Sequence, residues 1–405
     1  LVGSEMCIRD RTFYFLEDGR CFIVREETST GYMHLYLYGI GQGVLHPITQ
    51  GEWEVTDFVG LRGDKVYYIS TESSPLKRDL YRVGLDGKHK ERLTPGDGYY
   101  SIYPSADLSY YICEGGDSSA PGRTDVFNAA GKRVRTLYDN APLKEALVEA
   151  GLPVREFFTF TTERGDELNG YMLKPLDFDP AKRYPVLLTQ YSGPGSQQVA
   201  EGWGPDWEDA LVTHGYIVVC VDPRGTGYRG EEFKKLTYGN LGRLEVEDQI
   251  STARYMARQS YVDPARIGIY GWSYGGFMAL GCAFRGEGLF KMAIAVAPVT
   301  SWRYYDSIYT ENFNGLPDDY PKGYDDNSPV NLAHLFRDDS TRLLIVHGTA
   351  DDNVHFQNTM EMARALNKLG KQYDMMVYPD QNHSMMPDDM IHVREKMLRY
   401  TLENL

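Results

Sequence analysis

The stretch IGIYGWSYGGFM, residues 267–278, places a single serine between glycines and aromatic residues at the end of an apolar run. Ser273 stands in the pattern Gly-x-Ser-x-Gly, with a strand-like run before it and a helix-like run of small residues after it. In this context the pattern predicts a tight strand-to-helix turn that lifts the hydroxyl clear of the sheet edge. The turn also aims the backbone N–H of Tyr274 at a developing oxyanion. We therefore predict that Ser273 is a nucleophile rather than a bystander in a glycine-rich turn.

A nucleophilic serine needs a histidine as its base, and the base needs a carboxylate that orients it. In hydrolases with this turn, the acid and then the histidine follow the serine along the chain. LLIVHGTADDNVHF, residues 343–356, offers Asp351 or Asp352 after an apolar run, and spacing alone does not choose between them. MMVYPDQNHSMM, residues 375–386, offers His383 as the base. Four other histidines fit the role less well because they adjoin or lie within expected strands and helices: His214, His347, His355 and His392. Of these, His347 is expected to cap or pack at a strand end.

The sequence around these candidates alternates apolar runs with amphipathic ones. Near-continuous apolar strands joined by helices indicate a parallel sheet covered on both faces. We expect residues 146–405 to form an α/β hydrolase domain with a doubly wound, mostly parallel sheet. The expected strands are residues 184–191, 215–222, 266–271, 292–299, 342–348 and 373–379, and the clearest helices are residues 245–259 and 356–370.

Residues 12–145 consist instead of short aromatic and β-branched runs bounded by Gly, Asp and Ser, a pattern typical of strands and turns. The set Leu35-Tyr36, Gly39 and Thr49 recurs 45 residues later as Leu80-Tyr81, Gly84 and Thr94. A period of about 40–45 residues is typical of propeller blades. We predict that the hydrolase domain is preceded by the last two or three blades of an incomplete β-propeller.

The opening residues 1–11, LVGSEMCIRDR, resemble a translated sequencing adapter. We expect this segment not to be native, and the chain to be a truncated piece of a longer protein.

The formal net charge of −15 argues against nucleic-acid binding. The lack of a long apolar run argues against a membrane span. The five cysteines have no metal-binding spacing, and we expect no metal or cofactor.

From about residue 45 to the end, the sequence closely resembles the dipeptidyl peptidase IV branch of the prolyl oligopeptidase family. The resemblance is carried by GEWEV at 51–55, LEVEDQI at 244–250, GWSYGG at 271–276 and HGTADDNVHFQ at 347–357. It implies a serine exopeptidase that releases N-terminal dipeptides from peptides with a penultimate proline or alanine. It also implies that Asp351, rather than Asp352, is the acid that orients His383.

The resemblance further implies how the substrate is held. Tyr191, in LLTQYSGPGSQ at 187–197, would donate its phenol to the oxyanion beside the N–H of Tyr274. Asn353 would hold the carbonyl of the residue before proline. In WRYYDSIY, residues 302–309, three aromatics share one face of an expected helix, a pattern that also suits a plain core-facing helix. The implied pocket for the proline ring comprises Tyr274, Val299, Trp302, Tyr305, Tyr309 and Val354.

The main departure from the family pattern is that nothing in residues 12–140 matches the acidic residues that grip the substrate's free amino group. A prolyl tripeptidyl peptidase is therefore the nearest alternative. A carboxylesterase on the same fold would lack the proline-sized aromatic pocket, and a non-catalytic binding protein would not need an intact Ser273, Asp351 and His383. By resemblance alone, the partners would be peptides with proline near the N-terminus, the complete protein would form a homodimer, and it would lie in the periplasm or at the surface of a bacterium.

Overall fold

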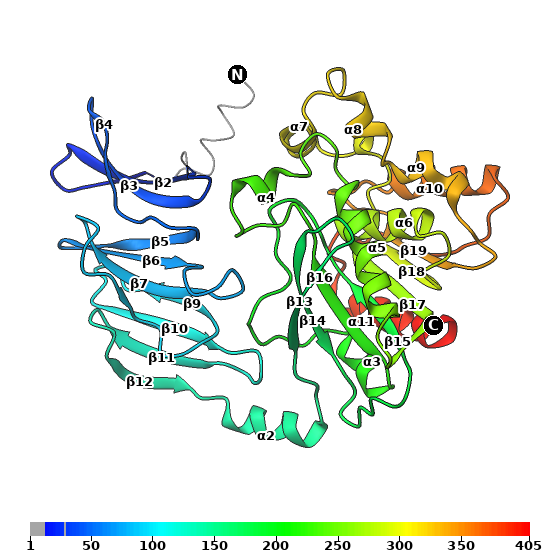
Figure 1. The fold of residues 1–405 in the computed structure, drawn as a ribbon, viewed down its shortest axis with the longest axis horizontal. Coiled ribbons are helices and arrows are strands. Elements are labelled where there is room, and N and C mark those ends of the chain that lie inside the picture. Colours follow the sequence, from blue (N-terminus) through cyan, green and yellow to red (C-terminus); the bar gives the residue numbers. More distant parts are fainter. Residues whose placement is uncertain (1–12, 28–29) are drawn as a thin grey trace. The chain divides into compact units, whose positions relative to one another are not determined.

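The computed structural model describes residues 13–27 and 30–405, and it divides into two compact units (Figure 1). The first unit extends to Val154 and also includes residues 200–204 and 227–234. The second unit comprises the remaining residues from Arg155 to Leu405. The division thus follows Val154 rather than residue 145, because helix α2, Ala141–Ala150, stays with the first unit. The expectation that residues 1–11 are not native falls outside the described residues.

Three four-stranded antiparallel sheets make up most of the described part of the first unit. Each sheet follows the chain order of its strands, as in the blades of a β-propeller. The strands are β1 Phe13–Phe15, β2 Cys21–Glu27, β3 Met33–Gly39 and β4 Gly43–Pro47; β5 Val55–Arg62, β6 Lys65–Ser70, β7 Asp79–Gly84 and β8 Glu91–Arg92; and β9 Tyr99–Pro104, β10 Tyr110–Gly116, β11 Arg123–Asn128 and β12 Arg133–Tyr138.

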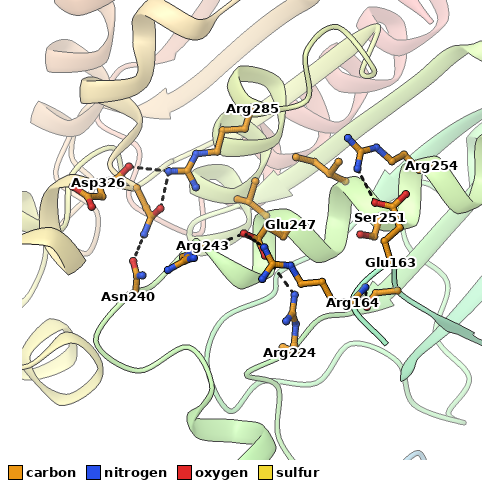
Figure 2. Close-up of a pocket in the computed structure, with 14 residues that line it drawn as sticks. Glu163, Arg164, Arg224, Asn240, Arg243, Glu247, Ser251, Arg254, Arg285 and Asp326 are labelled. Carbon is orange, nitrogen blue, oxygen red and sulfur yellow. Dashed lines mark hydrogen bonds and ion pairs between the residues drawn. The ribbon is translucent and has the colours of Figure 1, made fainter. Parts of the chain in front are cut away.

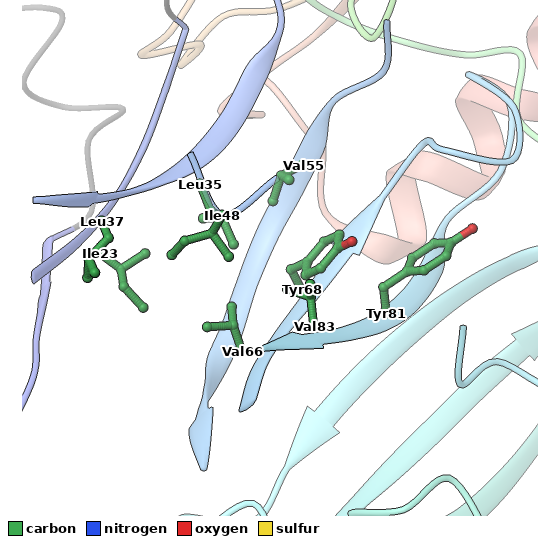
Figure 3. Close-up of a cluster of buried hydrophobic side chains, with 9 residues drawn as sticks. All are labelled: Ile23, Leu35, Leu37, Ile48, Val55, Val66, Tyr68, Tyr81 and Val83. Atoms are coloured by element: carbon green, nitrogen blue, oxygen red, sulfur yellow. The ribbon is translucent and has the colours of Figure 1, made fainter. Parts of the chain in front are cut away.

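The repeat in the sequence corresponds to equivalent core positions in successive sheets. Leu35 on β3 and Leu80 on β7 are both completely buried. Leu35 packs in a cluster with Val66 and Tyr68 between the first two sheets (Figure 3), and Leu80 packs in the next cluster with Phe127. The 45-residue spacing therefore marks one sheet stacked on the next.

The second unit is built around one eight-stranded sheet with the strand order β13-β14-β16-β15-β17-β18-β19-β20. Six adjacent strands of this sheet pair in parallel, and they are the six strands that the sequence predicts: β16, β15, β17, β18, β19 and β20. The hairpin of β13 and β14 is antiparallel and was not predicted. The strands are β13 Glu156–Thr161, β14 Glu167–Leu173, β15 Tyr184–Thr189, β16 Ile217–Asp222, β17 Val262–Trp272, β18 Met292–Val296, β19 Arg342–Gly348 and β20 Asp374–Tyr378.

Helices connect the parallel strands, so the loops after β15, β17, β18, β19 and β20 emerge at the same edge of the sheet. The longest helix, α11, ends the chain, and no helix of the described residues is long and apolar enough to cross a bilayer. The helices are α3 Asp209–Thr213, α4 Glu231–Lys235, α5 Leu244–Ala257, α6 Tyr274–Arg285, α7 Ser307–Asn314, α8 Pro321–Asp325, α9 Pro329–Leu332, α10 Gln357–Lys368 and α11 Pro387–Asn404, with 3₁₀ turns at Trp302–Tyr304 and Ala333–Leu335.

The expected single helix over residues 302–309 is wrong. The chain forms a short 3₁₀ turn at Trp302–Tyr304, becomes extended at Tyr305, and starts α7 only after Asp306. The side chain of Asp306 accepts a hydrogen bond from the backbone N–H of Tyr309 and so caps α7. This cap sets the start of the helix and separates the two halves of the aromatic run.

Glu208 is a buried acid at the start of α3, next to the carboxyl end of β15. The hydroxyl of Thr189 donates to its carboxylate at 2.7 Å. Burial, with the nearby negative charge of Asp206, raises the pKa of Glu208 to about 7, and the bond from Thr189 opposes this only in part. A carboxyl pKa that is higher in the folded state than in the unfolded state stabilises the protein at low pH, and this stabilisation is lost as pH rises through the folded pKa.

We therefore predict that Glu208→Gln flattens the pH dependence of stability. Between pH 5 and pH 8 the wild type should lose about 2–3 kcal/mol more unfolding free energy than the variant, because its neutral carboxyl must ionise in a buried place. Urea-induced unfolding of both proteins at the two pH values measures the difference. Parallel pH dependence of the two proteins would contradict the assignment.

Candidate active site

Ser273 lies between the end of β17 and the start of α6, with φ 61° and ψ −117°. This conformation is rare for a residue with a side chain and costs on the order of 1–3 kcal/mol. Tyr274 is the first residue of α6, a position whose N–H has no partner within the helix. The strained turn thus places the partly exposed serine beside a backbone N–H that has no acceptor among the described residues, as the sequence pattern predicts.

The glycines around Ser273 are needed because backbone atoms pack directly against them. A Cβ on Gly271 would lie 2.2 Å from the carbonyl oxygen of Gly275, and a Cβ on Gly275 would lie 2.5 Å from the carbonyl oxygen of Gln190. The Gln190 side chain also donates to the Gly275 carbonyl at 2.9 Å. The turn is therefore fastened to the end of β15, where Tyr191 follows.

His383 lies in the loop after β20 and is tied to both neighbouring loops. Its Nδ1 is 2.8 Å from Oδ2 of Asp351, in the loop after β19. Its backbone carbonyl accepts a hydrogen bond from the indole N–H of Trp272 at 3.1 Å. Because Trp272 directly precedes Ser273, this bond links the base candidate to the serine turn.

The carboxylate of Asp351 is buried and accepts hydrogen bonds on both oxygens, whereas Asp352 is exposed. Oδ1 accepts the backbone N–H groups of Asn353 at 3.0 Å and Val354 at 2.9 Å. Burial alone would raise the pKa of Asp351, but hydrogen bonds to the two histidines His347 and His383, with the backbone bonds, hold it well below its usual range. The acid next to His383 is thus kept ionised.

His347, a weaker candidate for the base that was expected to cap or pack at a strand end, is also a member of this cluster. Its ring is fully buried, and its Nε2 lies 3.1 Å from Oδ2 of Asp351 and 2.8 Å from the carbonyl of Val354. Two acceptors at one nitrogen require that Nε2 carry the proton. The hydroxyl of Thr359 lies 2.7 Å from Nδ1 and fixes the other side of the ring. The signal in the sequence is its place at the end of β19, four residues before Asp351.

Tyr191 follows β15, and its ring centroid lies 6.0 Å from that of Tyr274. Burial raises the pKa of Tyr191, which keeps the phenol protonated. Among the described residues its hydroxyl has no hydrogen-bond partner, so the proton remains available to a ligand. The structure therefore brings both predicted oxyanion donors, the Tyr191 phenol and the Tyr274 N–H, to one region.

The predicted pocket aromatics form one cluster despite the break in the expected helix. The ring of Trp302 lies 5.4 Å from that of Tyr274, 6.0 Å from that of Tyr305 and 6.3 Å from that of Tyr309, between centroids. The hydroxyl of Tyr305 donates to Oδ1 of Asn353 at 2.8 Å. Val299 and Val354, which follow β18 and β19, are buried.

The side chain of Tyr274 is hydrogen-bonded to a buried acid, Glu245 on α5. The Tyr274 hydroxyl donates to Glu245 at 2.7 Å, and the backbone N–H of Gly242 donates to the other oxygen at 3.0 Å. Burial raises the pKa of Glu245 to about 7. The sequence offered LEVEDQI as a family marker but gave no sign of this contact.

A cavity of about 810 Å³ opens beside these residues and is lined by His383, Asn353, Tyr305 and Tyr309, among others. Ser273 and Tyr191 do not line it. Within residues 13–27 and 30–405, neither the Ser273 hydroxyl nor Nε2 of His383 has a hydrogen-bond partner. Hydrogen bonds of this kind are often long or misaligned in a site without substrate.

In the same described part of the chain, no group of three or more His, Cys, Asp or Glu side chains could hold a metal ion.

Family models match both units of the chain. The prolyl oligopeptidase family matches residues 203–405, and the N-terminal region of dipeptidyl peptidase IV matches residues 7–121. Among curated proteins, a probable dipeptidyl-aminopeptidase B of Aspergillus niger is 41% identical over 366 residues, covering 88% of this chain and 40% of the relative. One from Sclerotinia sclerotiorum is 39% identical over 348 residues, covering 84% and 38%. The chain therefore spans about two fifths of the length of these relatives.

Two solved structures resemble nearly the whole chain. Porphyromonas gingivalis dipeptidyl peptidase 4 has a TM-score of 0.93 and 41% identity, covering 99% of this chain and 56% of that one. A putative dipeptidyl aminopeptidase IV from Bacteroides ovatus has a TM-score of 0.89 and 28% identity, covering 97% and 58%. Together with a family model that covers half of the chain, these likenesses confirm the resemblance that the sequence motifs carry. The chain belongs to the prolyl oligopeptidase family of serine peptidases, in its dipeptidyl peptidase IV branch, with propeller sheets followed by an α/β hydrolase domain.

Proposed function

We propose that this protein is a serine exopeptidase that releases N-terminal dipeptides from peptides whose second residue is proline or alanine. One observation carries the proposal: the loop of His383 bonds Asp351 on one side and Trp272, the neighbour of Ser273, on the other. An oriented imidazole fastened beside a strained serine turn is the arrangement that acyl transfer requires. The names of the relatives support release of dipeptides.

In the proposed mechanism, His383 accepts the proton of Ser273 as the serine oxygen attacks the carbonyl carbon that follows proline. Asp351 keeps Nδ1 of His383 protonated and stabilises the imidazolium that forms. The Tyr191 phenol and the Tyr274 N–H stabilise the oxyanion. His383 returns the proton to the leaving amine, and water then hydrolyses the acyl-enzyme by the same steps.

The aromatic cluster supports the choice of proline. A pyrrolidine ring presents only apolar faces and carries no N–H, so it suits a pocket walled by Trp302, Tyr305 and Tyr309. Asn353 is bonded to Tyr305 through its oxygen, and its amide N–H₂, which has no acceptor among the residues that the structure describes, can hold the carbonyl of the residue before proline. Alanine is small enough to enter the same space.

We predict that protein expressed from the complete gene hydrolyses a Gly-Pro anilide and that Ser273→Ala abolishes this activity, because Ser273 supplies the oxygen that forms the acyl-enzyme. Rates with Gly-Pro anilide, Ala-Ala-Pro anilide and a short acyl ester test the claim. A clear preference for the tripeptide anilide would replace dipeptide release by tripeptide release, and hydrolysis of the ester alone would make the protein a carboxylesterase.

For the oxyanion donor, we predict that Tyr191→Phe lowers kcat at least about tenfold with little change in KM, because the phenol bonds the oxyanion mainly in the transition state. Steady-state kinetics with the Gly-Pro anilide measure both constants. Phenylalanine preserves the ring contact with Tyr274, so packing is controlled. An unchanged kcat would remove Tyr191 from the mechanism.

For the second histidine, we predict that His347→Leu lowers kcat/KM, because the buried Asp351 carboxylate loses one of its hydrogen-bond donors and orients His383 less well. Steady-state kinetics with the Gly-Pro anilide measure the loss. His347→Gln, whose amide can restore an N–H, serves as the matched control and should recover part of the rate. An equal loss in both variants would mean that His347 only supports packing.

A further inference from the structure

A second cavity, of about 570 Å³, lies in the second unit beside helix α5 and apart from the residues described above (Figure 2). Five arginines line it, and none of its lining residues is a lysine, in a chain whose net charge is −15. Arginine is the cation that recognises planar and tetrahedral oxyanions through paired N–H donors. The arginines are Arg164 from the turn between β13 and β14, Arg224 after β16, Arg243 immediately before α5, Arg254 within α5, and Arg285 at the end of α6.

Three of these arginines are already paired with carboxylates, of which Glu163 and Glu247 line the cavity and Asp248 does not. The pairs are Arg224 with Asp248 at 2.6 Å, Arg254 with Glu163 at 2.8 Å and Arg164 with Glu247 at 3.1 Å. The first pair is buried, and Arg224 bonds Asp248 through both its Nε and its Nη2. These three arginines shape the wall and have little charge left to offer a ligand.

Arg285 differs because its guanidinium bonds only neutral oxygens. It donates to the backbone carbonyl of Asp326 at 2.8 Å and to the side-chain oxygen of Asn327 at 2.7 Å. No carboxylate of the described residues lies within ion-pair distance of it. Burial lowers the pKa of Arg285, as expected for a partly buried cation with too little compensation.

Arg243 is the other under-compensated cation. Its closest carboxylate contact is 3.9 Å, to Glu247, and about half of its side chain is exposed. Arg243 and Arg285 line the same cavity, and the positive charge of Arg243 lowers the pKa of Arg285, whereas the negative charges of Glu247 and Asp326 raise it. Arg243 directly precedes α5, so the positive end of that helix dipole adds to the same local charge.

We propose that Arg243 and Arg285 together bind a phosphate-sized oxyanion in this cavity. A bound oxyanion would give Arg285 a charged hydrogen-bond acceptor in addition to its neutral ones, would give Arg243 a closer anion than Glu247, and would offset the repulsion between the two guanidinium groups. The carboxylates of Glu247 and Asp326 also line the cavity, so the anion sits on the guanidinium side of it. The volume leaves room for an organic group attached to the phosphate, and both free phosphate and a phosphate monoester have the required chemistry.

Calorimetric titration of the protein with inorganic phosphate, at constant ionic strength, tests the site. We expect saturable binding by the wild type, weakened at least about tenfold by Arg285→Gln or Arg243→Gln, because each variant removes a charge-assisted hydrogen bond to the anion. Arg258→Gln is the matched control, because Arg258 also pairs with Glu163 but does not line the cavity, and it should bind phosphate like the wild type. Circular dichroism confirms that each variant is folded, and Arg243, being half exposed, carries the test if Arg285→Gln does not fold.

A parallel titration with glycerol phosphate distinguishes the two sources of the anion. Tighter binding than phosphate identifies a monoester as the ligand, and weaker binding identifies the free ion. Absence of saturable phosphate binding by the wild type, or equal binding by the wild type and both cavity variants, overturns the proposal. Because this test uses no peptide substrate, its result is independent of the proposed peptidase activity.

Discussion

The carboxylate of Asp351 is the interaction on which the candidate site depends. It is buried, yet its two oxygens receive two backbone N–H groups and approach the rings of His347 and His383. A buried carboxylate that lacked these donors would gain a proton and could no longer orient a base. Three of its four hydrogen-bonding partners come from β19 and the loop that follows it, and only His383 comes from the loop after β20. The geometry of one loop thus keeps a negative charge in place for the imidazole of another.

A second constraint acts on the serine itself. The positive φ of Ser273 is costly, and the surrounding backbone enforces it, because Gly271 and Gly275 allow approaches that any Cβ would block. The same close approach fastens the turn to Gln190 and so places Tyr191 beside Tyr274. Strain at the serine and the position of Tyr191, the proposed second oxyanion donor, therefore have one cause. The parallel strands of the second unit, and the helices that connect them, supply the rigidity that holds this arrangement.

The sequence predicted the parts of the fold that follow from local patterns. The apolar runs predicted all six strands of the parallel region, and the glycine pattern predicted the turn at Ser273. It missed the antiparallel hairpin of β13 and β14 and the break at Tyr305, because a capping bond from Asp306 overrides helical periodicity. Spacing could not choose Asp351 over Asp352, since that choice depends on which carboxylate is buried beside His383. The second contact to Asp351, from His347, depends on tertiary packing and left no mark beyond a strand-end histidine.

In the proposed mechanism Ser273, His383 and Asp351 act on one substrate carbonyl, although the serine and the histidine are not hydrogen-bonded to each other in the structure. A crystal structure of the protein after reaction with a fluorophosphonate tests this mechanism. We predict phosphorus bonded to the Ser273 oxygen, with the phosphonyl oxygen within hydrogen-bond distance of the Tyr191 phenol and the Tyr274 N–H, and Nε2 of His383 facing the adduct. An unmodified Ser273, or an adduct that points away from both donors and from His383, would contradict it.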